Sequence, residues 1–338
     1  SGGGSRVGVI VCRNVYGLQG SYGVTLGGSD SFLELPHLIC KVGLVAHSRR
    51  HPAQKRRHFA SRLGEPENVI DKKIVNIALF GVDTRSKNSF KGRSDSIIIL
   101  SVNTTDKKVK LISVLRDSLV PIEKNGKNTF NKINSAYASG GPELAIKTLN
   151  TIFDLDISEY ATVNFSGMTE IIGAVGGIEI EVTDREVSMI NEMVTTHYEQ
   201  FGLQGEPPKV SSAGKHLLDG VQAVAYSRIR YVPNAEGTSN DYGRTDRQRY
   251  VLEQVFYKST QMGISQYIDL IKALSPYCET SLSYSEILNL AVDVLLRSPT
   301  FEESRVPFIE YKMPSPNAGV GSIVYYDLNF AAKLIHNF

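Results

Sequence analysis

Three short apolar runs follow one another at residues 74–80, 96–102 and 109–114, and each is rich in β-branched residues. Runs of this length that are apolar at nearly every position are typical of strands buried on both faces of a sheet. The turn-like sequence Asn103-Thr104-Thr105-Asp106 separates the second run from the third, which favours a direct connection between two strands. A sheet of this kind needs helices on both faces to shield it from water.

Helical patterns and further strand-like runs alternate along the rest of the chain. The sequence predicts strands at residues 161–165, 178–182 and 226–231. It predicts helices at residues 142–153, 168–174, 217–225, 244–257, 267–274 and 283–296. The last of these helices opens with Ser283 and Glu286 at capping-box spacing. Alternating strands and helices predict an α/β fold in which a layered sheet carries helices on both faces.

Bulk composition narrows the class of protein. The chain has 338 residues, 41% of them hydrophobic, which is enough for a sizeable core in one large domain or two smaller ones. A formal net charge of +2 provides no global positive field of the kind that nucleic-acid-binding proteins use. The three cysteines have neither metal-ligand spacing nor the pattern of a disulfide framework.

Residues 1–70 differ from the rest of the chain. They begin Ser-Gly-Gly-Gly-Ser, continue with a glycine-rich stretch, and end in a basic stretch at residues 49–62. We interpret them as an N-terminal segment without an assigned fold, namely a linker, a tag or a disordered arm. No run approaches the roughly 20 apolar residues that a membrane helix needs, so we expect no membrane anchor in this chain. The globular domain is expected at residues 71–338.

Two aspartates flank the first two predicted strands. Asp83 follows the first apolar run and Asp95 directly precedes the second, with Arg85 and Arg93 in the loop between them. If the two strands are antiparallel neighbours, both carboxylates lie at the same edge of the sheet. Paired carboxylates beside cations suit a hard divalent ion bound to phosphate. The alternative is that both are solvated turn aspartates, since Asp is a favoured turn residue.

Arginine at the end of the third strand adds to this edge. Arg116 and Asp117 directly follow the run at residues 109–114, and Lys132 comes before a glycine-rich turn. An arginine in this position can reach a ligand at the sheet edge. A surface ion pair between Arg116 and Asp117 is the alternative.

A second group of cations lies between residues 228 and 249. Arg228 and Arg230 are two positions apart, which would place them on one face of a strand. Arg244, Arg247 and Gln248 have the spacing of one helix face. Guanidinium groups bind phosphate oxygens bidentately and stay charged at any physiological pH. The alternatives are an ion-pair network with Glu236, Asp241 and Asp246, or a nucleic-acid surface, which the interspersed acids disfavour.

Motifs of other phosphate-handling and hydrolytic enzymes are absent from the sequence. It has no Gly-x-x-x-x-Gly-Lys-Ser/Thr phosphate loop. It also lacks the Gly-x-Ser-x-Gly nucleophile motif and the His-Glu-x-x-His zinc motif. The residues alone therefore indicate a site for anionic oxygens and leave its substrate open.

A series of short motifs across residues 72–260 resembles the LytR-CpsA-Psr family of bacterial cell-wall enzymes. In order, they are Leu79-Phe80-Gly81-Val82-Asp83-Thr84-Arg85, Arg93-Ser94-Asp95, Ile112-Ser113-Val114-Leu115-Arg116-Asp117, Lys132-Ile133-Asn134-Ser135-Ala136-Tyr137, Gly140-Gly141, Leu218-Asp219-Gly220, Tyr226-Ser227-Arg228-Ile229-Arg230, and Asp241-Tyr242-Gly243-Arg244-Thr245-Asp246-Arg247-Gln248. One departure is Leu115, where the family usually has proline.

The resemblance implies a fold and a set of site residues. The fold is a three-layer α-β-α sandwich with a central mixed β-sheet and an apolar pocket for a polyprenyl tail. The metal ligands are Asp83 and Asp95, which would hold Mg²⁺, with Mn²⁺ as a substitute, and together with Arg116 they form the catalytic set. The residues that bind the pyrophosphate are Arg85, Arg93, Arg116, Arg228, Arg230, Arg244, Arg247 and Gln248.

The resemblance also implies an activity. Family members are phosphotransferases that move an anionic glycopolymer, such as teichoic acid or capsular polysaccharide, from an undecaprenyl diphosphate carrier to peptidoglycan. The expected partners are that lipid-linked glycan, the peptidoglycan acceptor and membrane lipid at the pocket mouth, with no nucleic acid. The expected location is the extracellular face of the bacterial cytoplasmic membrane. The alternatives are a polyprenyl pyrophosphatase, which would use water as acceptor, and a non-catalytic transcriptional attenuator.

Overall fold

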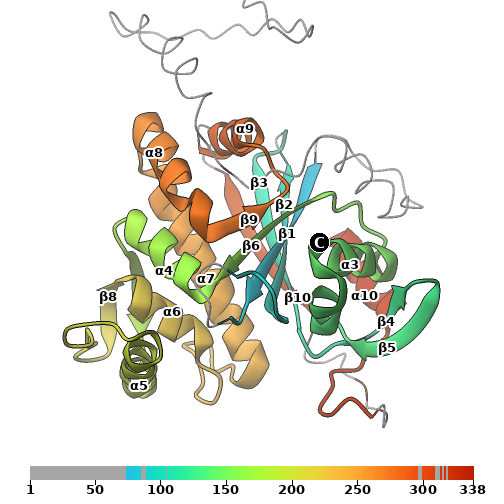
Figure 1. The fold of residues 1–338 in the computed structure, drawn as a ribbon, viewed down its shortest axis with the longest axis horizontal. Coiled ribbons are helices and arrows are strands. Elements are labelled where there is room, and N and C mark those ends of the chain that lie inside the picture. The colour runs from blue at the N-terminus through green and yellow to red at the C-terminus, as the bar shows by residue number, and fades with distance from the viewer. Residues whose placement is uncertain are drawn as a thin grey trace, which may run out of the picture. The chain divides into compact units, whose positions relative to one another are not determined.

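A computed structural model describes residues 74–84, 89–103, 105–295, 299–308, 313, 316 and 319–338. All of them fall within the unit that spans His47–Phe338. A six-stranded sheet runs through its centre (Figure 1). From one edge to the other, the strands are β10 (Thr300–Val306), β3 (Lys108–Val114), β2 (Ser94–Asn103), β1 (Ile74–Val82), β6 (Glu159–Asn164) and β9 (Cys278–Thr280).

The sheet is mixed. β1 and β2 are antiparallel, as are β2 and β3, and the short β9 pairs antiparallel with β6. β1 runs parallel to β6, and β3 runs parallel to β10. The expected α/β class with a central mixed sheet is confirmed.

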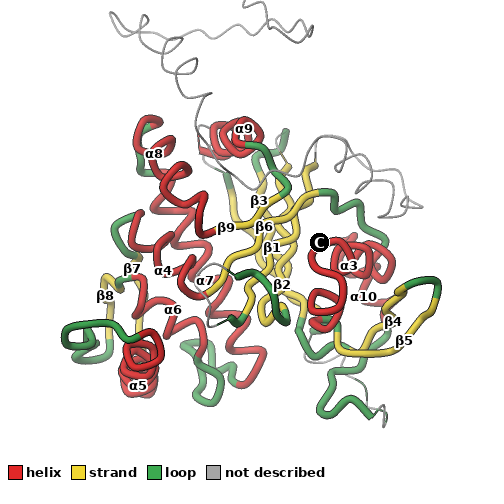
Figure 2. Tube along the Cα trace, in the orientation of Figure 1, coloured by secondary structure: helices red, strands yellow, loops and turns green. Residues whose placement is uncertain are grey.

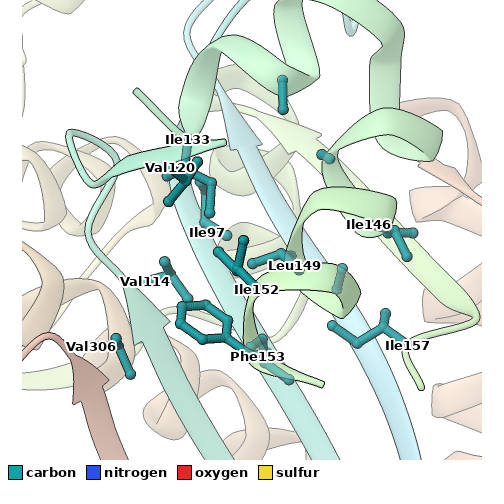
Figure 3. Packing of buried hydrophobic residues seen from close by; sticks show 14 of the residues in the cluster. Ile97, Val114, Val120, Ile133, Ile146, Leu149, Ile152, Phe153, Ile157 and Val306 are labelled. Atoms are coloured by element: carbon teal, nitrogen blue, oxygen red, sulfur yellow. The ribbon is translucent and has the colours of Figure 1, made fainter. Parts of the chain in front are cut away.

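Alternate residues of the central strands enter two different cores. Ile97 and Ile99 of β2 pack into the cluster that contains Leu149 and Phe153, whereas Ile98 belongs to the cluster on the opposite face. Figure 3 shows the first cluster, in which side chains from one helix lie against those of the strands. Because side chains alternate along a strand, an apolar residue at every position is what a sheet covered on both faces requires.

Helices lie on both sides of the sheet (Figures 1 and 2). On one side are α3 (Asn134–Phe153) and α10 (Leu328–Asn337), with a hairpin of β4 (Leu119–Lys124) and β5 (Lys127–Lys132) beside them. On the other side are α4 (Phe165–Ala174), α6 (Gly220–Arg228), α7 (Asn240–Thr260), α8 (Ile264–Leu274) and α9 (Tyr284–Leu295). Beyond α6 lie α5 (Asp184–Phe201) and a ribbon of β7 (Ile178–Val182) and β8 (Gly214–Leu218).

Most of the predicted elements exist, with shifted ends. The capping box at the last predicted helix is confirmed, because the Ser283 N–H and Oγ both donate to Glu286 Oε2, at 2.8 and 2.6 Å. No sequence pattern had predicted α5, α10, β10 or the β4–β5 hairpin. In the described part of the chain, no helix combines the length and apolar character that crossing a membrane requires.

One predicted boundary was wrong, and it matters for the site. Residues 226–231 were expected to be a strand and residues 217–225 a helix, but the helix α6 spans Gly220–Arg228. It starts where the Asp219 side chain accepts from the Gln222 N–H at 2.8 Å and Gln222 reaches back to the Asp219 N–H. This capping box fixes the start of the helix, and the buried alanines and Val224 inside it extend the helical pattern to Arg228.

Candidate functional site

The edge of the sheet where β1 ends carries both predicted aspartates. Asp83 directly follows β1, and Asp95 is the second residue of β2. After a register shift at Gly81, Val82 pairs with Ser94, so the two antiparallel strands bring both aspartates to one edge, as predicted. The Asp83 side chain is exposed, and that of Asp95 retains 27% of its accessible surface.

Arg116 connects β3 to this edge. Its Nη1 lies 2.9 Å from Asp95 Oδ2, and its Nε lies 3.7 Å from Asp117 Oδ2. Lys132, at the end of β5, lies 2.9 Å from Asp117 Oδ1. Burial lowers the pKa of Arg116, but the carboxylates of Asp95, Asp117 and Asp241 outweigh it and leave the pKa raised. Arg116 is therefore held charged between two acids from different strand ends.

Two further arginines share a single carboxylate. Arg230 Nη2 and Arg244 Nη2 lie 3.0 and 2.9 Å from Asp241 Oδ1, in the first turn of α7. Burial, together with the neighbouring charges of Arg116 and Arg230, lowers the pKa of Arg244 to about 10. Arg116 and Arg230 both act on Arg244, and Asp241 acts on Arg116 as well, so the three arginines lie close together. We call these three residues the arginine cluster.

The arginine cluster has unused hydrogen-bonding capacity. The Nε atoms of Arg116, Arg230 and Arg244 are buried and have no hydrogen-bond partner among the described residues, and the same holds for Gln248 Oε1. A buried polar group without a partner costs about 1–3 kcal/mol. Three cations with three unused N–H donors, opposed in the cluster by Asp95 and Asp241, form a site that an anion with several oxygens would complete.

The remaining predicted phosphate ligands are dispersed. Arg228, in the last turn of α6, lies over the ring of Phe165 at 4.4 Å. Because Arg228 ends helix α6, it does not share a strand face with Arg230, contrary to what their spacing had predicted. Arg93 is exposed at the start of β2. Arg85 lies outside the described residues.

Arg247 was expected to lie on the same face of helix α7 as Arg244 and to bind the ligand there, but it lies elsewhere. Its side chain is fully buried, with Nε 2.7 Å from Glu186 Oε1 of α5. Its Nη1 and Nη2 donate to the carbonyls of Ile229 and Val232, at 3.2 and 3.0 Å. Those carbonyls flank Arg230, so Arg247 fixes the loop that carries a cluster arginine.

The expected alternative of an ion-pair network is also present, beside the cluster. Asp246 pairs with Arg249 at 2.5 Å and with Arg305 of β10 at 2.8 Å, and Arg249 also contacts Glu303 at 3.1 Å. These pairs tie α7 to the edge strand. The two acids thus have different partners. Asp241 pairs with Arg230 and Arg244 of the cluster, whereas Asp246 pairs with Arg249 and Arg305 and links α7 to β10.

An apolar cavity of about 260 Å³ reaches Ser96 and Gln248, which are close in sequence to Asp95 and Arg244. It lies between the sheet and helices α4, α6 and α7, and its walls are mostly aliphatic and aromatic. The lining includes Leu79, Ile98, Val163, Phe165, Met168, Ile171, Val251, Leu252, Val255 and Phe256. The lining also includes Gly81 and the polar residues Ser96, Asn164, Ser227 and Gln248. Ser96 directly follows Asp95, and Gln248 lies one helical turn after Arg244, so an apolar chain in the cavity could carry an anionic group into the cluster.

The acids at this edge fit a particular kind of metal binding. No group of three or more His, Cys, Asp or Glu side chains suited to a metal occurs among the residues that the structure covers. Mg²⁺ commonly takes one or two carboxylates and fills its remaining positions with water and phosphate oxygens. Asp83 and Asp95 fit an ion that arrives with a phosphate ligand, and they do not form a complete protein cage.

Sequence reasoning had treated Asp241 only as a neutralising acid and had not considered Glu186 or Phe165. Asp241 has a local signal, because it stands in the first turn of the helix that carries Arg244. The Glu186–Arg247 pair joins residues 61 positions apart and has no such signal.

The sequence was found to be similar to a known protein family and to curated relatives. A model of the LytR_cpsA_psr family matches residues 44–331. A curated relative from Enterococcus faecalis, named polyisoprenyl-teichoic acid–peptidoglycan teichoic acid transferase TagU, is 34% identical over 228 residues, which cover 67% of this chain and 67% of that protein.

Solved structures share the fold. Protein gbs0355 from Streptococcus agalactiae superposes with a TM-score of 0.64 at 28% identity, covering 78% of this chain and 86% of that one. The LytR-CPS2A-psr family protein YwtF (TagT), solved with bound octaprenyl pyrophosphate lipid, superposes with a TM-score of 0.57 at 21% identity. The superposition covers 81% of this chain and 96% of that one.

Proposed function

The chain belongs to the LytR_cpsA_psr family, and from this we propose that it is a phosphotransferase that moves an anionic glycopolymer from a polyprenyl diphosphate carrier to peptidoglycan. The polymer is of the teichoic acid or capsular type, and the carrier is undecaprenyl diphosphate. The reaction takes place at the extracellular face of the bacterial cytoplasmic membrane, where membrane lipid meets the pocket mouth. The name of the Enterococcus faecalis relative supports this substrate class.

One observation carries the proposal: Gln248, which lines the apolar cavity, stands one helical turn from Arg244 of the buried arginine cluster, whose Nε donors are unused. A prenyl diphosphate has the matching chemistry, namely a long apolar tail attached to several anionic oxygens. The octaprenyl pyrophosphate of the TagT structure is a lipid of this kind, held by a protein of the same fold.

The arginines do most of the work that phosphoryl transfer requires. Such reactions depend chiefly on positioning and on stabilising charge at the transferring oxygens. Arg116, Arg230 and Arg244 bind the pyrophosphate oxygens, and Asp241 fixes the orientation of two of them. Gln248 lines the cavity near its polar end, and Arg228 lies over Phe165 in the cavity wall, so both stand near the junction of tail and headgroup.

We assign the metal position to Asp83 and Asp95, with Mg²⁺ as the ion and Mn²⁺ as a substitute. The ion, when bound, neutralises charge on the bridging and leaving oxygens of the pyrophosphate. Asp95 is oriented for this by Arg116, whose ion pair keeps its carboxylate at the strand end. Arg93, exposed on the same connection, extends the positive edge toward the polymer phosphate.

Transfer of a lipid-linked glycopolymer to peptidoglycan tests the proposal directly. Arg230→Ala and Arg244→Ala should reduce transfer at least a hundredfold, because each removes a bidentate donor from the phosphates. Lys272→Ala, an exposed residue paired only with Asp269 among described residues, is the matched control and should transfer normally.

Assays with and without peptidoglycan separate transfer from hydrolysis. Polymer released as free phosphate ester in the absence of acceptor would indicate a pyrophosphatase. Normal transfer by both cluster variants would show that the site lies elsewhere.

A further inference from the structure

A second pocket lies on the other face of the sheet, and we propose that it binds the acceptor, as a neutral, hydroxyl-rich sugar of the receiving glycan. This inference rests on the proposed function and specifies where its second substrate sits. The pocket has a volume of about 550 Å³. Its walls come from the connection between β1 and β2, from the first part of α3, and from Glu279 of β9.

Two neighbouring residues of β9 show how the pocket and the apolar cavity are related. Cys278 lines the cavity and Glu279 lines the pocket. Because consecutive side chains of a strand point to opposite faces, the two spaces lie on opposite faces of the sheet. They also share a wall, since Asn164 lines the cavity and its Nδ2 donates to the carbonyl of Ser89, which lines the pocket, at 3.3 Å.

Asn164 is the last residue of β6, which runs parallel to β1 and pairs with Val82 at that strand's end. The shared wall therefore stands at the edge that carries Asp83. Gly92, another pocket residue, is close to the same place, because a Cβ atom there would lie 3.3 Å from the Asp83 carbonyl oxygen. Both spaces thus meet at the site of the pyrophosphate.

The charge of the pocket distinguishes its ligand from the lipid headgroup. Among the lining residues that the structure describes, Lys91 is the only cation and Glu279 the only acid. Such a balanced lining gives a polyanion no advantage over a neutral ligand. The anionic polymer has its partners in the arginine cluster instead.

The shape of the wall suits a sugar. Helix α3 is interrupted at Gly140 (φ −152°, ψ 18°) and Gly141 (φ 66°, ψ −161°), and these residues lack side chains that could cover the backbone. An interruption of a helix leaves N–H and C=O groups outside the helical ladder, where hydroxyl groups can meet them. Ala138 and Ser139, which have small side chains and are exposed, continue this part of the wall.

Two buried tyrosines, Tyr137 of α3 and Tyr160 of β6, are fixed by hydrogen bonds. Tyr160 Oη donates to Glu279 Oε1 at 3.3 Å, and burial together with Glu279 raises the pKa of Tyr160, which keeps it a donor. Tyr137 Oη donates to Thr162 Oγ1 at 3.0 Å, and burial raises its pKa to about 12. The bond from Tyr160 orients the Glu279 carboxylate, whose other lone pairs are left for sugar hydroxyls.

The geometry of phosphoryl transfer requires this placement. The attacking and leaving oxygens lie roughly in line through phosphorus. The lipid tail occupies the cavity on one face, so its phosphate leaves in that direction and the attacking hydroxyl comes from the other face. The hydroxyl oxygen bonds to the phosphorus nearest the polymer, and the bond from that phosphorus to the bridging oxygen breaks. The hydroxyl proton passes to solvent water, and the lipid departs as its monophosphate, which keeps the bridging oxygen and its electron pair.

Variants of the pocket test the inference. Ala138→Trp fills it from an exposed position, and Glu279→Gln removes a hydroxyl acceptor while keeping the shape. Both should raise the KM for peptidoglycan glycan at least tenfold and leave the affinity for geranylgeranyl pyrophosphate unchanged. Thr151→Trp, at an exposed position of the same helix outside the pocket, is the control and should match the unsubstituted protein.

Direct binding separates this inference from the proposed function. An N-acetylglucosamine tetramer, measured by calorimetry without lipid, should bind the unsubstituted protein and fail to bind Ala138→Trp. That result stands even if no transfer is observed, in which case only the proposed function fails. Equal binding by both proteins, a normal acceptor KM in Ala138→Trp, or a parallel loss of lipid affinity would overturn the assignment of the pocket.

Discussion

Glu186 and Arg247 form an ion pair, with Oε1 and Nε 2.7 Å apart, in which the two side chains keep 1% and 0% of their accessible surface. The pair joins α5 to α7. Glu186 also accepts from the N–H and the hydroxyl of Thr183, which caps α5. The opposite side of the guanidinium holds the carbonyls of Ile229 and Val232.

Breaking this pair should destabilise the protein more than replacing it. Glu186→Gln or Arg247→Met leaves one buried charge without its partner, and we expect a loss of about 3–5 kcal/mol in the free energy of unfolding. The double variant Glu186→Leu/Arg247→Met should recover most of that loss, because it leaves no buried charge. Urea denaturation measures all three.

The same double variant separates stability from positioning. It lacks the donors that hold the loop of Arg230, so its affinity for prenyl pyrophosphate should fall at least tenfold although the fold is stable. An affinity equal to that of the unsubstituted protein would show that the loop holds its shape without Arg247.

We expect the buried charge of Arg244 to lower the free energy of unfolding of the ligand-free protein. Its pKa, lowered to about 10, corresponds to roughly 3 kcal/mol of cost for keeping the buried group charged. Since the pKa in the folded state lies below the ordinary value, this cost is fully present at every pH below about 10 and declines as the pH rises from that value toward the ordinary pKa of 12.5. Arg244→Met should therefore stabilise the ligand-free protein by about 1–3 kcal/mol, equally at pH 6 and pH 8.

The stability advantage of Arg244→Met over the unsubstituted protein should be lost when a diphosphate-like anion is bound. Methylene diphosphonate should raise the melting temperature of the unsubstituted protein and leave that of Arg244→Met unchanged. Arg230→Met, whose side chain is 31% exposed, serves as the comparison, because it should lose the ligand response without the gain in stability. A destabilised Arg244→Met protein would mean that its ion pair with Asp241 outweighs the desolvation.

Filling the apolar cavity should affect long prenyl chains selectively. Val255→Trp places a larger side chain where the tail would lie, so affinity for geranylgeranyl pyrophosphate should drop at least tenfold because apolar contact area is lost. Binding of inorganic pyrophosphate should not change. Tyr257→Trp, on the same helix at a position 56% exposed, is the matched control. Equal losses for both ligands would show that the substitution disturbs the arginine cluster.

Two glycines at neighbouring helices should respond in opposite ways to alanine. A Cβ atom on Gly220 would overlap the carbonyl of Thr169, where α6 approaches α4. Gly220→Ala should cost about 1–3 kcal/mol in the free energy of unfolding. Gly173, in α4, has nothing within 4 Å of the added atom, so Gly173→Ala should stabilise by about 0.5–1 kcal/mol. Calorimetric melting of the two variants compares them, and destabilisation by Gly173→Ala would contradict the expectation.

The strands that form the centre of the sheet could be predicted because their signal is local. Each residue of β2 from Ile97 to Leu100 is buried, so the sequence had to be apolar at every position. β10 could not be recognised in this way. It is the edge strand Thr300–Val306, with two glutamates and an arginine, and its identity as a strand depends on pairing with β3, far away in the chain.

The site residues show the same difference between local signals and contacts that are distant in sequence. Asp83, Asp95 and Arg116 stand directly beside strand ends, so their placement at one edge followed from antiparallel pairing. The placement of Arg228 and Arg247 was predicted wrongly because spacing alone cannot tell which side of an element a side chain faces, and their binding of a ligand stays a prediction. The capping box of Asp219 and Gln222 starts helix α6, so residues 226–228 are helical and not extended. Arg247 instead pairs with Glu186, a residue distant in sequence, in the protein interior.

The pairing of β3 with β10 has a consequence for how the chain is made. Lys108 of β3 contacts Glu302 of β10 at 2.8 Å, and the two residues are 194 positions apart. At about 5–20 residues per second, a ribosome takes roughly 10–40 s to synthesise that stretch. During this interval β3 has β2 on one side and a row of unpaired backbone groups on the other, which is the form in which strands recruit other chains. The nascent protein is thus most prone to aggregate before β10 has been synthesised, because β10 then closes that edge.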